Sequence, residues 1–147
     1  MAAEGLITVH SSHGPEGTMN RFEAEVRSRG MTVFANIDHS AAAAAAGLAL
    51  LPTDLLIFGN ANGGTPLMQS VQAIGVDLPL KALVWQDESR TTWLSYNDPG
   101  WLAQRHGLDE TTKATINAMS ESLKAIASKA TARDGASHAP INATRLD

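Results

Sequence analysis

A glycine-rich segment between an apolar strand and a helix start is the part of this sequence best suited to hold a ligand. Gly59, Gly63 and Gly64 can expose backbone N–H groups, and a helix beginning near Pro66 adds the positive end of its dipole. This combination predicts a site for a small anion or carboxylate. The alternative is a tight glycine turn that has only a structural role, with Thr65 as the helix cap.

The same segment does not match the common phosphate-binding motifs. It lacks the Gly-Lys-Ser/Thr of a P-loop, and its glycine spacing differs from that of a dinucleotide fingerprint. Asn60 and Asn62 add a polar pair. We therefore expect a binding loop without a recognisable nucleotide motif.

A histidine beside an aspartate is a second candidate for chemistry. His39 follows Asp38 at the end of an expected strand, so the histidine could act as a general base with a carboxylate neighbour. The alternative is a capping and hydrogen-bonding pair, because no nucleophile or second ligand stands at a telling spacing. No catalytic motif is recognisable, so the catalytic residues are unknown and enzyme activity stays open.

Two polar side chains on an expected β-hairpin complete the candidate site. Lys81 shares a strand face with Leu83 and Trp85, and it could pair with an anionic ligand if that face lines a pocket. Tyr96 could donate a hydrogen bond from the neighbouring strand. The alternative is a solvated sheet face with ordinary polar alternation. The predicted ligand-binding residues are His39, Asn60, Gly63, Gly64, Thr65, Lys81 and Tyr96.

Composition argues against several kinds of site and partner. The 147 residues include no cysteine, and the five histidines show no metal-ligand spacing, so we expect no metal and no cofactor. A net charge of -4 offers no basic field for nucleic acid or an anionic membrane. No stretch reaches the roughly 18 apolar residues of a membrane span, and the first residues do not resemble a signal peptide. A cytoplasmic protein is the expectation.

The elements that must position these residues are strands and helices in near alternation. We expect strands at residues 6–10, 31–37, 55–58, 80–86 and 91–96, and helices at 15–29, 41–46, 66–74, 101–106 and from 109 onward. The last two strands form a hairpin, which disfavours an all-parallel sheet. The strand at 55–58 is apolar on both faces, so we expect it inside the sheet with material on each side.

The length and composition predict one domain and a tail. Residues 1–132 are expected to form a single α+β domain, and residues 133–147 a flexible C-terminal tail. The last helix should bury one apolar stripe, because its apolar residues recur at spacings of three and four. The stripe consists of Ile116, Met119, Leu123, Ile126 and Ala130.

Several short motifs taken together resemble a known family. They are Asp38-His39 after a strand, residues 51–60, Gly64-Thr65-Pro66-Leu67-Met68, Asp77-Leu78-Pro79-Leu80-Lys81 and Tyr96-Asn97-Asp98-Pro99. Over residues 5–107 the combination resembles the family known as domain of unknown function number 302.

The resemblance implies a fold but no activity. It implies a TATA-binding-protein-like α+β fold, with one mainly antiparallel sheet of about five strands, helices packed on one face, and members that form homodimers. The family commonly has Pro where this chain has Ala61, which should leave the loop freer.

We therefore expect a homodimeric module that binds a small anionic molecule between the sheet and the 59–66 loop. Two alternatives remain open. One is a small enzyme with acid–base residues around Asp38 and His39. The other is a structural or regulatory dimerisation domain, with Trp85 or Trp93 against a partner.

Overall fold

Five strands form one antiparallel sheet in the computed structural model, which describes residues 3–134. The strand order is β1-β5-β4-β3-β2, and each neighbouring pair is antiparallel. The predicted α+β fold is confirmed, and β3 lies inside the sheet as expected. The strands are β1 (Leu6–His10), β2 (Thr32–Asp38), β3 (Thr53–Gly59), β4 (Leu80–Gln86) and β5 (Thr92–Asn97).

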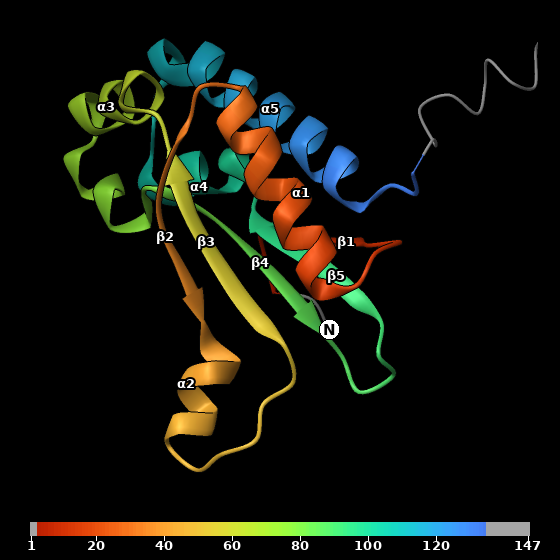
Figure 1. Cartoon of the computed structure of the whole chain (residues 1–147). Helices are drawn as coiled ribbons and strands as arrows, with labels where there is room; N and C mark the ends of the chain where they lie inside the picture. The colour runs from red at the N-terminus through yellow and green to blue at the C-terminus, as the bar shows by residue number, and fades with distance from the viewer. Residues whose placement is uncertain (1–2, 135–147) are drawn as a thin grey trace, which may run out of the picture.

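Two helices, α1 (Pro15–Ser28) and α5 (Lys113–Thr131), lie side by side over the sheet (Figure 1). The chain begins α1 at a proline in the first helical turn, where a missing N–H costs nothing. The α4 helix stops at Gly107, whose φ of 66° suits the left-handed helix stop. The other helices are α2 (His39–Ala45), α3 (Ala61–Ser70), α4 (Pro99–His106) and the 3-10 helices η1 (Gln72–Asp77) and η2 (Glu110–Thr112).

The main core lies between one face of the sheet and the pair α1 and α5. Alternate strand residues, such as Leu56, Phe58 and Val84, point at the helices and are fully buried. The rings of Phe22 in α1 and Phe58 in β3 meet edge to face, with centroids 5.3 Å apart. The predicted stripe on the last helix is largely buried: Ile116, Leu123, Ile126 and Ala130 are buried, and Met119 is half-buried.

The other face of the sheet keeps apolar side chains partly exposed. Leu55 and Ile57 of β3 point away from the main core and are half-buried. The strand register gives them Leu83 and Lys81 of β4 as neighbours on this open face. The expectation of material on both faces of β3 is therefore not met within residues 3–134, because α1 and α5 both lie on the core side.

Two tryptophans lie next to each other on the same open face. Trp85 and Trp93 are cross-strand partners, with ring centroids 6.2 Å apart. The Trp85 Nε1 donates to Ser95 Oγ at 2.9 Å, and the Trp93 Nε1 donates to Asp87 Oδ2 at 2.9 Å. Their polar atoms are thus satisfied, and each half-buried ring leaves apolar surface uncovered.

The tail expected at 133–147 lies, from residue 135 onward, outside the described residues. Among residues 3–134, no helix combines the length and apolar character that crossing a bilayer requires.

Candidate functional site

The glycine-rich segment is the first turn of α3 rather than a loop. Asn60 is the N-cap, with φ of -143° and ψ of 124°, and its Oδ1 accepts a hydrogen bond from the Asn62 N–H at 2.8 Å. The Gly64 N–H reaches the Asn60 carbonyl at 3.0 Å. The prediction of Thr65 as cap and Pro66 as first helical residue is therefore wrong. Asn is the stronger N-cap and stands earlier in the chain.

The glycines of this turn have ordinary backbone conformations. None of Gly59, Gly63 and Gly64 has a positive φ. Ala61, at the position where the family commonly has Pro, is the first residue of α3, and Pro is well tolerated there. Pro66 stands inside the helix and has no N–H to donate to the carbonyl four residues before it. Two glycines and a proline make the start of α3 an intrinsically weak helix.

A groove with a volume of about 960 Å³ opens beside this turn. Its walls come from α3, from α5, and from the adjoining ends of β2, β3 and β4 with the residues that flank them. Arg29, just after α1, is the one charged residue among the described residues that line it. Polar lining residues are Asn60, Asn62, Thr65, Thr115 and Ser122, and large apolar ones are Met31, Phe34, Met68, Leu78, Leu80, Met119 and Leu123.

Four of the seven predicted site residues line the groove. They are Asn60, Gly63, Gly64 and Thr65. All four belong to the start of α3, where the sequence had predicted a loop before the helix. A Cβ at Gly64 would make ordinary contacts, 3.7 Å from the Leu78 side chain and 3.9 Å from that of Met68.

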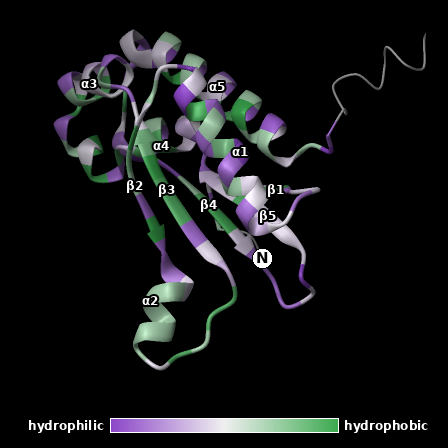
Figure 2. Cartoon of the chain, in the orientation of Figure 1, coloured by the Kyte–Doolittle hydropathy of each residue, from purple (hydrophilic) through white to green (hydrophobic). Residues whose placement is uncertain are grey.

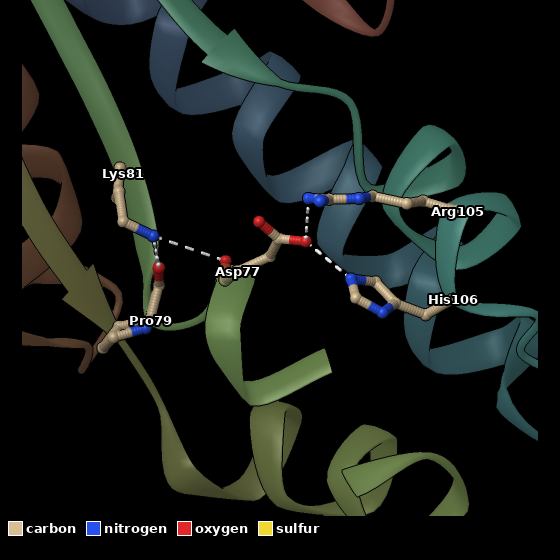
Figure 3. A network of polar contacts seen from close by, with 5 residues as sticks. All are labelled: Asp77, Pro79, Lys81, Arg105 and His106. Carbon is tan, nitrogen blue, oxygen red and sulfur yellow. Dashed lines mark hydrogen bonds and ion pairs between the residues drawn. The ribbon is translucent and has the colours of Figure 1, made fainter. Parts of the chain in front are cut away.

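The other three predicted residues lie elsewhere. Lys81 faces the open side of the sheet opposite Ile57, and its Nζ donates to the carbonyls of Pro79 at 3.0 Å and Asp77 at 3.4 Å (Figure 3). Tyr96 is part of the main core and 5% exposed. Burial raises the pKa of its hydroxyl, and the charge of Asp98 adds to the rise.

His39 is exposed and lies at the other end of β2 from the groove, at the start of α2. The neighbouring Asp38 caps α2, because its Oδ1 accepts from the Ala41 N–H and from the Ser40 hydroxyl, each at 2.8 Å. The bond from the Ala41 N–H and then that from Ser40 hold the pKa of Asp38 below its ordinary value. This geometry corresponds to the capping alternative.

One polar cluster near the groove was not foreseen from the sequence. Asp77, at the end of η1, accepts from Arg105 Nη1 at 2.7 Å and from His106 Nε2 at 2.6 Å (Figure 3). Both partners belong to α4, so the cluster ties η1 to α4. Gly75 of η1 and Leu78 after it line the groove, so this link supports one of its walls. No local pattern signals a pairing across 28 residues.

Opposing effects act on the pKa of Asp77. Burial raises it, but the hydrogen bond from His106 and the charge of Arg105 outweigh burial, so the pKa lies below 3.8. A carboxylate with a lowered folded-state pKa adds stability that is present above the unfolded pKa and is lost as the pH falls through the folded one.

We therefore expect Asp77→Asn to lower the free energy of unfolding at pH 7 by about 1 to 2 kcal/mol. The difference from the natural chain should shrink as the pH falls below about 4, since the natural carboxylate then also becomes neutral. Urea unfolding measured from pH 7 to pH 2 tests this. Two curves that stay parallel over the whole range would contradict it.

A protein of known structure has a similar fold. A crystal structure of an uncharacterized conserved protein DUF302 from Bacillus stearothermophilus is similar with a TM-score of 0.77 and 22% sequence identity, covering 87% of this chain and 99% of that one. At that identity the likeness shows the fold alone.

Curated relatives are more similar in sequence but longer. Fluoride-specific ion channel FluC 1 of Brucella suis biovar 1 is 51% identical over 115 residues, which is 78% of this chain and 45% of that protein. The protein of the same name from Brucella abortus biovar 1 is also 51% identical over 115 residues, or 43% of its length. This chain thus spans less than half of the length of these relatives.

The family model described as Domain of unknown function DUF302 matches residues 7–126, as the sequence motifs predicted. The chain belongs to the DUF302 family.

Proposed function

We propose that this chain is a homodimeric module that binds a small anionic molecule in the groove between α3 and α5. The groove lining supports the proposal, because one cavity of about 960 Å³ joins an apolar interior to a rim with a single charged group, Arg29. Small-molecule sites are commonly concave, mostly apolar and about 300 to 1,000 Å³ in volume. The described lining contains no carboxylate, and the carboxylate of Glu25, which pairs with Arg29, lies outside it.

Arg29 is free enough to serve such a ligand. Its Nε lies 3.5 Å from Glu25 Oε2, one turn earlier in the sequence, and its side chain is 34% exposed. An ion pair of this kind on a helix surface contributes only about 0.3 to 0.5 kcal/mol. The guanidinium can therefore turn to a bound anion at small cost, while the exposed Asn60 and Thr65 offer polar groups in the same lining.

We expect Arg29→Gln to weaken binding of an anionic ligand about tenfold, which corresponds to roughly 1.4 kcal/mol. The measurement is a thermal-shift screen with carboxylates and phosphates, since a ligand raises stability by RT ln(1 + [L]/Kd). Arg27→Gln is the matched control. Arg27 is exposed on the same helix, pairs with Glu23 at 2.9 Å and is not part of the groove lining. The proposal would be wrong if no anion raised the melting temperature, or if both variants lost the same amount of binding affinity.

The homodimer in this proposal is supported by the open face of the sheet. Ile37, which is 38% exposed, extends the apolar surface formed by Leu55, Ile57, Leu83, Trp85 and Trp93. Contiguous apolar patches larger than a few hundred Å² are uncommon on monomers and mark interaction sites. The segment between α2 and β3 adds Leu48, 67% exposed, and Leu50, 49% exposed, and it extends from the end of the sheet as an apolar projection (Figure 2).

We expect Leu83→Glu to convert a dimer into a monomer, because a carboxylate at the centre of this face would lose its water on association. Sedimentation equilibrium measures the change, with circular dichroism to verify folding. Val76→Glu is the control, since Val76 is an apolar residue that is 74% exposed and belongs to η1, not to a strand of the sheet. A natural chain that is monomeric at every concentration would remove this part of the proposal.

The cytoplasmic location expected from the sequence stays a prediction.

A second candidate function is an accessory role in fluoride transport. It is favoured by the names of the curated relatives, which are fluoride-specific ion channels matched over less than half of their length. An ion channel needs structure that spans the bilayer, and the described residues of this chain hold no helix suited to that. We infer that the channel of those relatives lies outside the matched part, and that the matched part works alongside it.

Cells that lack the gene for this chain should then grow more poorly in fluoride than their parent. Growth in sodium fluoride is compared with growth in sodium chloride at equal ionic strength, and a plasmid copy of the gene should restore the parent's behaviour. Equal growth of both strains at every fluoride concentration would rule out this candidate.

A further inference from the structure

We propose that the ligand of the groove is an anionic amphiphile, with one carboxylate or similar head on a long unbranched apolar chain. This inference rests on the proposed function and names the class of ligand. It follows from three features of the groove: its position between two apolar clusters, the kind of side chains in its walls, and the single charge at its rim.

The groove lies between the two hydrophobic clusters of the fold. On one side Met31 and Leu80 pack against the main core, to which Leu123 belongs. On the other side Met68, Leu78 and Met119 pack against a smaller cluster of Leu67, Ile74 and Ile116. Six of these residues line the groove, namely Met31, Leu80, Leu123, Met68, Leu78 and Met119. An apolar chain bound there would join the two clusters and remove apolar surface of both from water, at about 25 cal/mol per Å².

The walls are built from adaptable side chains. Met31, Met68 and Met119 are three of the five methionines of the chain, and all three line this one groove. Methionine is unbranched and flexible, so it fills irregular gaps and adjusts to different apolar partners. A Cβ at Gly75 would lie 3.2 Å from the Met68 sulfur, so the glycine leaves Met68 space on that side. Such walls suit a flexible alkyl chain better than a rigid ring system.

The rim determines the sign of the head group. Arg29 is the one charged lining residue of the described chain, and the exposed Asn60 and Thr65 lie on the same lining. The overall charge of -4 would otherwise disfavour an anion. A small hydrated anion would contact only the polar rim. An amphiphile would contact the rim with its head group and the apolar walls with its alkyl chain.

The test is a binding series with straight-chain monocarboxylates on the full chain, below their micelle concentrations. Isothermal titration compares acetate, octanoate, decanoate and dodecanoate. Each methylene that becomes buried should tighten binding about threefold to fourfold. Dodecyltrimethylammonium, with the same chain and a cationic head, should bind at least about tenfold more weakly than dodecanoate, as expected for an arginine at the rim.

Two variants connect the binding to this groove. Ala118→Phe adds a ring within the groove lining. The variant should reduce dodecanoate binding at least about tenfold, since the ring occupies the space that the alkyl chain of the ligand needs. Ala24→Phe is the control, because Ala24 is also an exposed helical alanine and lies outside the lining. Equal loss in both variants would mean non-specific, detergent-like binding and would overturn the inference.

The remaining outcomes separate this inference from the proposed function. Acetate or phosphate bound as tightly as dodecanoate, and sensitive to Arg29→Gln, would overturn the amphiphile while an anion-binding module stands. Dodecyltrimethylammonium bound as tightly as dodecanoate would overturn the assignment of the head group. No binding by any member of the series or by the anion screen would remove both.

Discussion

Burial of one face of the sheet under α1 and α5 is the interaction on which the rest of this structure depends. Leu56, Phe58 and Val84 are fully buried, and Phe22 of α1 meets Phe58 edge to face. Because residues of a strand alternate between faces, the same packing leaves Leu55 and Ile57 on the other side of the sheet. The strand β3 is apolar on both faces, and the described helices cover only one of them. The other face of the sheet is therefore apolar and open.

The groove has a related origin. The α3 helix and η1 cannot reach the main core, so Leu67 and Ile74 form a second, smaller cluster with Ile116 at the start of α5. The space between the two clusters is the groove, and the bonds of Asp77 to α4 hold η1 in its position beside it. The residues that line the groove and the residues named for the open face do not overlap. The proposed ligand binding and the proposed dimerisation therefore do not compete for the same side chains.

This fold is compatible with widely different sequences. A structure with 22% identity reaches a TM-score of 0.77, so most side chains can change while one face of the sheet stays covered. Patterns of apolar and polar residues can maintain such packing with different side chains. The shape of the groove is more sensitive to substitution than this packing is, because one large side chain at Gly64 or Ala118 would change it.

The order of the strands and α-helices, the hairpin of β4 and β5, the buried stripe of α5 and the family could all be predicted from the sequence. They depend on alternation, helical spacing or short motifs, which are local features of a chain. Other features arise only when distant segments pack together. Asn60 rather than Thr65 caps α3, Lys81 turns to backbone carbonyls, and Tyr96 enters the core. Arg29, Phe34 and Met119 line the same groove as the start of α3 only after folding. A groove made from segments far apart in the chain leaves no local pattern, because its shape arises from how α3, α5 and the sheet pack together.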